Sequence, residues 1–464
     1  MDITLTSTAR QPSPADEPLI DVGTLQSELA GAGVRYAAIS FVDVHGKPKA
    51  KIVPLDHLGA AVSGSELFTG AALDAVPQEV NDDEVSAVPD LGGGIAMPWQ
   101  PDVTWFPSDL QLNGSPFEAC SRQILKRSVA HAAELGFVFN LGVETEFFIL
   151  RDGEKGPEPI EESDSLAKPC YDLRSLLRTF PVVDELVTTM NALGWGVYSF
   201  DHEDGNGQFE IDFSYTDAVA SADRLTFFKL MLGEITRRHG VYGTFMPKPF
   251  ANQTGSGAHM NMSLADSHGV NLFEDRADPR GCGLSTLGYQ FTAGVLRHAS
   301  SISAVIAPTV NSYKRLVKSG SASGFTWAPV FGTYGDNNRT NMVRIPMGGG
   351  RVECRAADSS MNPYLAAAVV LAAGLEGIRE QLDPGPPNTD NLYLLSDAEL
   401  SARGISSLPR TLLEAVEAFQ DDPLCLDVMG PQMHRAFAEQ KLREWEEFHT
   451  HVSQWERDRY LKFF

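Results

Sequence analysis

The chain lacks an excess of positive charge, a long apolar run and a regular cysteine pattern. Its formal net charge is −24, which excludes non-specific binding to nucleic acid or to anionic membranes. The longest apolar run, from Leu365 to Leu375, is too short to span a bilayer. The five cysteines are odd in number and scattered, so we expect neither a disulfide framework nor a paired zinc motif. These absences predict a cytoplasmic protein without membrane or nucleic-acid partners.

The first residues also lack the apolar core of a signal peptide. Residues 1–17 are polar and contain Pro12 and Pro14, so we expect a disordered tail there. With 464 residues the chain is long for a single core, and two or more domains are expected. Residues 62–115 are rich in turn-forming Gly and Pro. We place a domain boundary at the end of this stretch, which gives an N-terminal domain over 18–115 and a larger domain over 116–464.

Apolar spacing predicts a mixture of helices and strands, and therefore an α+β class. Residues 36–53 alternate around a turn at 43–48, which predicts a pair of strands. Asn362 and Pro363 are typical of the N-cap and first position of a helix, which we expect to end near Gln381. The other expected helices lie at 19–32, 120–135, 172–194, 217–239, 410–419 and 431–452.

Four segments combine alternating polar and apolar residues in the manner of strands with one polar face. They lie at 143–148, 207–213, 259–264 and 351–355. A solvated surface is the better explanation for any single acid among them. Here Glu, His and Arg recur across the four segments, and we therefore expect these strands to converge on one cavity.

The acids and the one histidine of this set have the chemistry of a divalent-metal site. Carboxylate oxygens with a single imidazole suit Mg²⁺ or Mn²⁺ better than zinc, and six ligands suffice for two ions that share phosphate oxygens. Arg344 and Arg355 lie in otherwise apolar segments, where an unpaired guanidinium would be costly, and Arg binds carboxylate and phosphate in a bidentate manner. The candidate metal ligands are Glu144, Glu146, Glu203, Glu210, His259 and Glu353.

A series of motifs in the same order resembles the glutamine synthetase superfamily over roughly residues 35–464. The matching segments are 144–148, 202–203, 207–210, 245–249, 255–259, 311–316, 338–346, 351–355 and 362–364. The resemblance implies an N-terminal β-grasp domain and a catalytic domain with a curved antiparallel sheet surrounded by helices. It also implies a dodecamer of two stacked hexameric rings, with each active site between neighbouring subunits.

The resemblance implies roles for individual residues as well. Those implied for one metal ion are Glu146, Glu203 and Glu210, and those for a second are Glu144, His259 and Glu353. Glutamate would be bound by Arg315, Arg355 and the backbone at Gly255. Arg339 and Arg344 would act on the ATP phosphates, and the nucleotide would lie near Ser263, Asn261 and Tyr215. ATP would phosphorylate the γ-carboxylate of glutamate, and an amine would then displace phosphate.

Two positions depart from the ammonia-using members. Trp327 stands where those members have a flap glutamate, and Thr69 stands where they have an aspartate of the ammonium pocket. An apolar wall and one hydroxyl suit an amine that carries a carbon substituent. Further segments at 41–51, 323–329, 382–386 and 451–464 look like the branch of γ-glutamyl amine ligases that use methylamine. The expected substrates are therefore L-glutamate, ATP and a small amine, with methylamine first.

Alternatives to methylamine stay open. A wall of Trp327, Phe325 and Phe68 would also fit aniline or another xenobiotic amine. Ammonia-dependent glutamine synthesis and a non-catalytic relative are the less expected readings. Asn261 and Thr254 replace residues usual in the superfamily, which indicates a diverged member. Tyr393 resembles the adenylylation site of some bacterial members, and an ordinary packing role explains it equally well.

Overall fold

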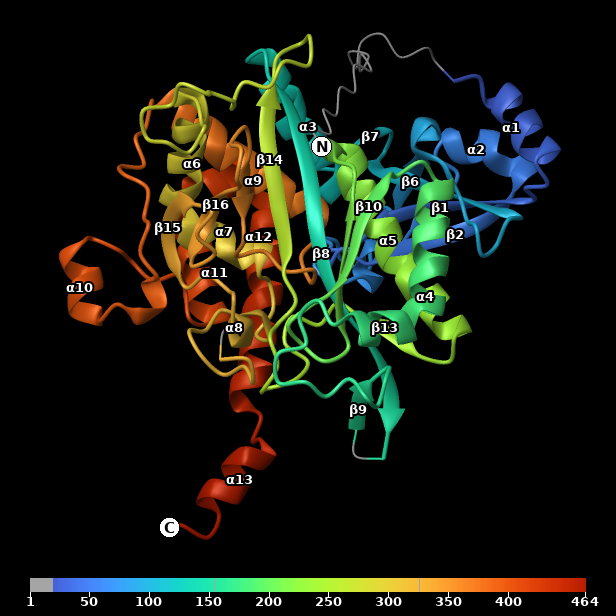
Figure 1. The fold of residues 1–464 in the computed structure, drawn as a ribbon. Coiled ribbons are helices and arrows are strands. Elements are labelled where there is room, and N and C mark those ends of the chain that lie inside the picture. Colours follow the sequence, from blue (N-terminus) through green and yellow to red (C-terminus); the bar gives the residue numbers. More distant parts are fainter. Residues whose placement is uncertain (1–19, 155, 325) are drawn as a thin grey trace.

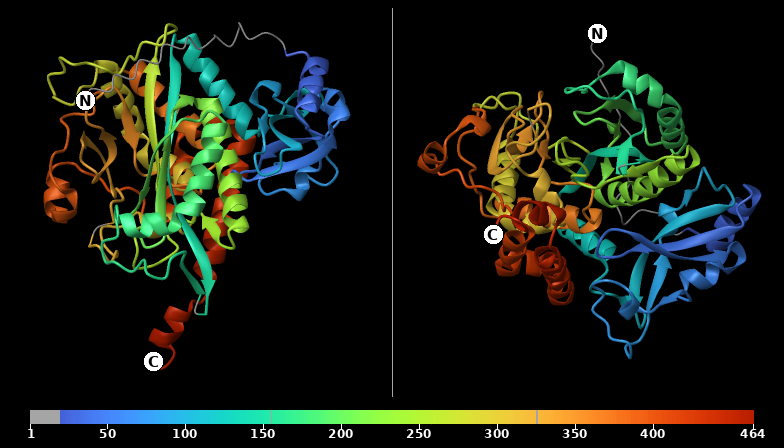
Figure 2. Two further views of the ribbon diagram at one scale, coloured as in Figure 1. Left: turned by 45° about the vertical axis from the view of Figure 1, so that its right-hand side comes forward. Right: turned by 90° about the horizontal axis from the view of Figure 1, so that it is seen from below.

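The computed structural model describes residues 20–154, 156–324 and 326–464 of the chain. The tail predicted over 1–17 lies outside the described residues. Two β-sheets dominate the fold, one formed before residue 117 and the other by residues 138–354 (Figure 1). Helices surround the larger sheet, and the N-terminal part lies beside it (Figure 2). The expected α+β class is confirmed.

The N-terminal part forms a mixed sheet, which has seven strands within the described residues. Its order is β2-β1-β6-β4-β3, and β5 and β7 also pair with β6. The predicted strand pair around residues 43–48 is β1 and β2. The strands are β1 Tyr36–Val42, β2 Pro48–Pro54, β3 Leu67–Phe68, β4 Val85–Pro89, β5 Ile95–Ala96, β6 Val103–Leu112 and β7 Ser115–Pro116. The helices beside them are α1 Val22–Gly31 and α2 Leu58–Val62.

The larger sheet is built around one long central strand, β8. Its order is β10-β11-β8-β14-β17-β16-β15, and the short strands β9, β12 and β13 also pair with β8. Strands β8 and β14 lie side by side through the middle of the molecule (Figure 1). The strands are β8 Val138–Gly153, β9 Gly156–Pro159, β10 Val197–His202, β11 Gln208–Phe213, β12 Thr216–Asp217, β13 Tyr242–Thr244, β14 Ala258–Ala265, β15 Phe331–Asp336, β16 Asn341–Ile345 and β17 Val352–Cys354.

The predicted helices are all found in the larger part or at the N-terminus, with shifts of a few residues at most ends. Those outside the N-terminal part are α3 Ser121–Glu134, α4 Leu173–Ala192, α5 Ala218–Arg238, α6 Thr286–Arg297, α7 Ala299–Ile306, α8 Ser312–Arg315, α9 Pro363–Arg379, α10 Asp397–Ala402, α11 Leu412–Asp421, α12 Pro423–Thr450 and α13 Gln454–Tyr460. Helices α6 and α7 were not predicted from the sequence. Helix α13 projects away from the body (Figure 1).

The prediction that the last long helix begins at residue 431 is confirmed, because a helical segment begins at Pro431, and α12 also contains a shorter, unpredicted segment that begins at Pro423. Asp422 caps its first turn, and Gly430 then adopts φ 74°, directly before Pro431. This positive φ breaks the regular helix, since only Gly takes it without cost. α12 is therefore two helical segments joined by a kink at Gly430, and the second begins at the predicted residue.

The turn at 43–48 attaches the N-terminal sheet to the start of α9. A Cβ on Gly46 would lie 2.9 Å from the Cα of Asn362, and the φ of Gly46 is 71°, so this close approach requires glycine. The Asn362 side chain donates to the carbonyl of Asp43 at 3.0 Å and accepts from the Tyr364 N–H at 3.0 Å. Asn362 is thus the predicted N-cap of α9, and it also holds the two parts of the chain together.

A buried ion cluster makes a second connection between the two parts. The guanidinium of Arg122 on α3 contacts Asp90 and Asp109 of the N-terminal part and Asp223 on α5, at 2.8–3.0 Å. The hydroxyl of Tyr364 donates to Asp223 at 2.7 Å. Arg122 is 4% exposed and Asp223 is 6% exposed, so removal of the guanidinium would leave the buried Asp223 carboxylate without its cation.

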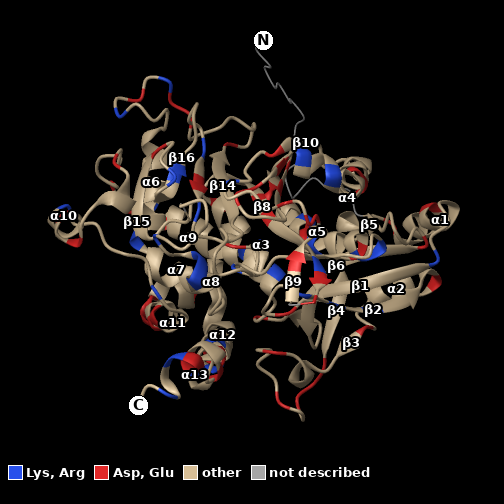
Figure 3. Cartoon of the chain, turned by 60° about the horizontal axis from the view of Figure 1, so that its bottom comes forward, with Lys and Arg blue, Asp and Glu red and all other residues tan. Residues whose placement is uncertain are grey.

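Charged residues are distributed over both parts of the chain (Figure 3). In the described part of the chain no helix combines the length and the apolar character that a membrane crossing requires.

Candidate active site

The register of the larger sheet places the predicted polar residues directly opposite one another. Glu146 on β8 pairs with Glu210 on β11, and Glu144 pairs with His259 on β14. Glu353 on β17 pairs with Asn261 on one side and with Arg344 on the other. Directly opposite residues have Cβ atoms about 5 Å apart, so the polar faces of five neighbouring strands meet in one cluster. The predicted convergence is therefore a consequence of strand register.

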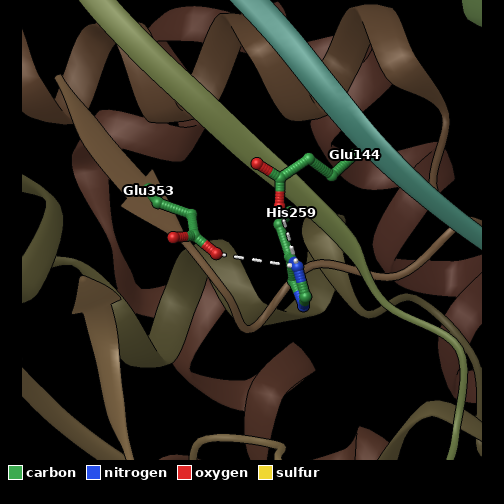
Figure 4. A group of neighbouring side chains, drawn as sticks. All are labelled: Glu144, His259 and Glu353. Carbon is green, nitrogen blue, oxygen red and sulfur yellow. Dashed lines mark ion pairs between the residues drawn. The ribbon is translucent and has the colours of Figure 1, made fainter. Parts of the chain in front are cut away.

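Glu144, His259 and Glu353 form the first candidate metal group (Figure 4). The Nδ1 atom of His259 lies 3.5 Å from a Glu144 oxygen and 3.6 Å from a Glu353 oxygen. Among the described residues this buried nitrogen has no hydrogen-bond partner. Burial, and next the charge of Arg355, holds the pKa of His259 well below its usual value, so the imidazole is neutral. A neutral imidazole beside two carboxylates is a suitable donor set for a divalent cation.

A second group lies on the other side of the imidazole. Its ligand atoms, from Glu146, Glu210 and His259, lie within 4.8 Å of one another. Glu203 does not complete a triad with Glu146 and Glu210, and it groups instead with Glu210 and Asp201. Asp201 was missed from the sequence, although it pairs with Glu210 across β10 and β11. The signal was the alternation of polar Ser199 and Asp201 on β10.

The acids of the cluster resist ionisation in the absence of a cation. Burial raises the pKa of Glu203 to about 8, with the carboxylate of Glu146 as the next cause. Burial and then Glu144 raise the pKa of Asp212 to about 7. Burial also raises the pKa of Glu210, followed by repulsion from Glu203, and the pKa of Glu146 is raised mainly by burial. Closely spaced carboxylates with raised pKa values fit a site that holds divalent cations.

Two of the predicted arginines are paired with Glu353. The guanidinium of Arg344 donates to one oxygen of Glu353, and that of Arg355 donates to the other at 2.5 Å. Arg355 directly follows β17, which is shorter than the strand predicted over 351–355. Glu353 has no exposed side-chain surface, so it is a fixed negative charge between two cations.

The other two predicted arginines differ in exposure. Arg315 is 3% exposed, and its guanidinium donates to the carbonyls of Ala356 and Arg355 at 3.1 and 3.0 Å. Arg339 is exposed in the loop between β15 and β16. Arg315 is therefore held rigidly at the site, while Arg339 has the freedom to approach a ligand from outside.

A small pocket that is open to solvent lies over the second group. A Cβ on Gly255 would lie 2.5 Å from the carbonyl oxygen of Pro247 and 2.7 Å from Cγ of Arg315, so only glycine fits there. The Gln208 side chain donates to Glu146 at 3.1 Å and accepts from Thr254 at 2.8 Å. The lining residues are Glu146, Glu203, Asp204, Gln208, Thr254, Gly255, His259, Arg315, Thr326, Trp327 and Arg355.

Trp327 and the next residue are anchored over this pocket by three hydrogen bonds. Its indole Nε1 donates to Asp204 at 2.8 Å, and its carbonyl accepts from Arg355 at 3.3 Å. The hydroxyl of Tyr393 donates to the next carbonyl, that of Ala328, at 2.7 Å. Trp327 has φ 56°, a left-handed conformation that is uncommon outside glycine. The tyrosine that resembled an adenylylation site is thus an anchor of this segment.

Thr69 is not brought to this pocket within the single chain. It lies between β3 and the next short turn of the N-terminal part, and its hydroxyl donates to Glu84 at 2.9 Å. Phe68 packs on Phe41 in the same sheet. Phe325 lies outside the described residues.

The residues expected near the nucleotide lie on β14 and beside β8. Asn261 donates to Glu144 at 2.9 Å and accepts from Arg351 at 3.0 Å, so it joins a metal-ligand candidate to an exposed cation. Ser263 lies two residues further along β14, on the same face. Tyr215 is 68% exposed, and its side chain covers Gly142 of β8.

Comparisons with known proteins agree with this geometry. A family profile described as "Glutamine synthetase, catalytic domain" matches residues 118–460. A glutamate–methylamine ligase from Methyloversatilis universalis is 43% identical over 432 residues, which cover 93% of this chain and 97% of the relative. A glutamine synthetase from Rhizobium leguminosarum bv. phaseoli is 40% identical over 432 residues, with 92% and 96% covered.

Solved structures match over the same length. The GmaS/ADP complex in its conformation 1 superimposes with a TM-score of 0.88 at 40% identity, covering 94% of this chain and 99% of the other. The structure of apo GmaS without ligand superimposes with a TM-score of 0.86 at 39% identity, with the same coverage of both chains. The family match covers well over half of the chain, and the superfamily resemblance inferred from the motifs is confirmed. The chain is a ligase that belongs to the glutamine synthetase family.

Proposed function

We propose that this enzyme joins the γ-carboxylate of L-glutamate to a primary amine, methylamine foremost, at the expense of ATP. The observation that carries this proposal is one pocket with a carboxylate and arginine cluster on one side and the indole of Trp327 on the other. The similarity to a glutamate–methylamine ligase supports it.

In this proposal the two clusters of candidate ligands each hold one Mg²⁺ or Mn²⁺ ion. Glu144, His259 and Glu353 would hold one ion. The resemblance assigns Glu146, Glu203 and Glu210 to a second, and Glu210 is the member that groups with Glu146 on one side and with Glu203 and Asp201 on the other. Bound divalent ions neutralise the charge that spreads over a transferring phosphoryl group. The buried Nδ1 of His259 and the raised acid pKa values support the assignment.

Two of the arginines would bind glutamate, and the other two would act on the phosphates of ATP. Arg315, Arg355 and the open backbone at Gly255 line the pocket and would bind the carboxylates and amino-acid head of glutamate. Arg344 and the exposed Arg339 would stabilise the phosphoryl group in transfer. Ser263, Asn261 and Tyr215 would contact the nucleotide.

Chemistry then proceeds through a γ-glutamyl phosphate. The γ-carboxylate attacks the γ-phosphorus of ATP and releases ADP, which converts one carboxylate oxygen into part of a leaving group. The nitrogen of a neutral amine attacks the acyl carbon, and the C–O bond to phosphate breaks. The products are a γ-glutamylamide, ADP and phosphate.

Thr69 would complete the pocket from a neighbouring subunit. Within one chain Thr69 does not line the pocket, and 42% of the Trp327 surface is exposed. We propose the dodecamer of two hexameric rings as the arrangement that covers this surface. The same proposal treats residues 18–115 as the domain presented to the neighbour and 116–464 as the catalytic domain.

The test is phosphate release from glutamate, ATP and Mg²⁺ with ammonium, methylamine, ethylamine, isopropylamine and aniline at equal free-base concentration. We expect methylamine to give the highest kcat/KM. A preference for aniline, which the indole wall also fits, would keep the reaction and change the substrate class. No release above the blank without amine would refute the proposal.

Trp327→Glu is expected to favour ammonium over methylamine. The new carboxylate replaces an apolar wall by an oxygen acceptor, and the ratio of kcat/KM for ammonium to that for methylamine should rise by about tenfold or more, as a charged hydrogen bond predicts. Trp327→Gln is the matched control, because it has the same length without the charge. An unchanged amine ranking in Trp327→Glu would contradict the assignment of this wall.

A further inference from the structure

Asp204 is an acid of the pocket that no motif singled out. It directly follows Glu203, lines the pocket beside Trp327, and is 7% exposed. Its Oδ2 atom accepts from the indole Nε1 of Trp327 at 2.8 Å and from the hydroxyl of Ser323 at 2.5 Å. Within the described residues no hydrogen bond ends on its Oδ1 atom. Asp204 is thus held in place through one oxygen while the carboxylate still lines the pocket.

An amine substrate makes two demands on its pocket. Its nitrogen carries N–H donors in both the neutral and the protonated form, so it needs an acceptor, and a buried donor left without one is costly. Its carbon substituent needs an apolar or aromatic surface, which for a cationic form also contributes a cation–π attraction. The chain has no acid at Trp327 or Thr69 to provide the first of these.

We propose that Asp204 is the residue that receives the amine. Its Oδ1 accepts an N–H of the incoming nitrogen, and its Oδ2 holds the Trp327 indole so that the substituent lies against the ring. The pairing selects primary amines with a small apolar group. This inference rests on the proposed amine-ligase function and adds to it the group that binds and orients the nitrogen.

The arrangement distinguishes the two parts of the amine. The carboxylate contacts the nitrogen, which ammonium and methylamine share, whereas the indole contacts the methyl group, which only methylamine has. Loss of the carboxylate should therefore weaken the binding of both amines. Loss of the indole should weaken the binding of methylamine more than that of ammonium. A residue that only stabilised the loop would affect glutamate and ATP as well, because Arg355 contacts Trp327 and also lines the glutamate end of the pocket.

The experiment compares wild type, Asp204→Asn and Trp327→Phe, with Asp184→Asn, an exposed aspartate on α4, as the matched control. KM is measured separately for methylamine, ammonium, glutamate and ATP. We expect Asp204→Asn to raise KM for both amines by about tenfold or more, the range for a charged hydrogen bond, while KM for glutamate and ATP changes less than about twofold. Trp327→Phe should raise KM for methylamine more than for ammonium, and Asp184→Asn should match wild type.

A binding measurement separates this inference from the ligase proposal. Saturation-transfer NMR on the methyl group of methylammonium, with ADP, Mg²⁺ and glutamate present, reports contact without turnover. Transfer in wild type that is lost in Asp204→Asn supports the inference even if no amide forms. Normal turnover with unchanged amine KM in Asp204→Asn overturns it and leaves the ligase function intact. Equal rises in all four KM values, or no transfer in wild type, also overturn it.

Discussion

Glu353→Ala is expected to abolish phosphoryl transfer and to lower the free energy of unfolding by about 3–5 kcal/mol. Glu353 has no exposed side-chain surface, and its two oxygens accept from Arg344 and Arg355. Without it, two guanidiniums that are 7% and 2% exposed lose their counter-charge. The first candidate metal group loses a ligand in the same step. Phosphate release and urea unfolding would measure the two losses.

Glu203→Ala is the comparison that separates activity from stability. Burial and the nearby carboxylate of Glu146 raise the pKa of Glu203, so its charge is unfavourable in the folded chain without metal. Its removal should abolish activity while leaving the free energy of unfolding equal or higher. Equal destabilisation by Glu203→Ala and Glu353→Ala, or retained phosphate release in either, would contradict the division between the two acids.

The metal-free protein is expected to lose stability as the pH rises from about 5 to 8, and Mg²⁺ is expected to restore it. The pKa of Glu203 is about 8 against an ordinary 4.5, and that of Asp212 is about 7 against 3.8. An acid whose pKa is raised by folding contributes stability below its ordinary pKa, and this contribution is lost as the pH passes through the folded value. Bound cations favour the ionised form and oppose the loss.

The measurement is the thermal midpoint against pH, with EDTA and with saturating Mg²⁺. The rise in the thermal midpoint caused by Mg²⁺ should be larger at about pH 8 than at about pH 5, because metal binding at low pH must displace protons. Glu203→Gln removes one titrating acid and should flatten the fall in the EDTA series. A midpoint that rises through this range with EDTA, or a gain from Mg²⁺ that is independent of pH, would show that the cluster does not titrate as a metal site does.

The sequence alone predicts which strands carry polar residues better than it predicts which of these residues share a metal ion. Alternation of polar residues identifies the faces of β8, β11 and β14, because a period of two is a local property. Which acids share an ion depends on register and on the path of the chain after each strand, which are not local. This is why the sequence did not reveal that Asp201 lies beside Glu203, which directly follows β10.

The helices of the fold were also predicted only in part. Helices α3 and α5 were predicted from their apolar spacing, whereas α6 and α7 were not predicted. Local sequence patterns also do not show whether Thr69 lines the pocket. A single chain keeps Thr69 in the N-terminal sheet, so its predicted contribution depends on a second chain.

The order of strands in the larger sheet has a consequence for biosynthesis. The central strand β8 is made early, but its neighbour β14 comes about a hundred residues later, and β17 later still. Ribosomes add about 5–20 residues each second, so the edge of β8 that pairs with β14 stays unpaired for several seconds. Glu353 emerges only after about three quarters of the chain. A nascent or truncated chain that ends before β17 therefore has a strand prone to aggregation and no complete cation site, and it depends on chaperones more than the finished enzyme does.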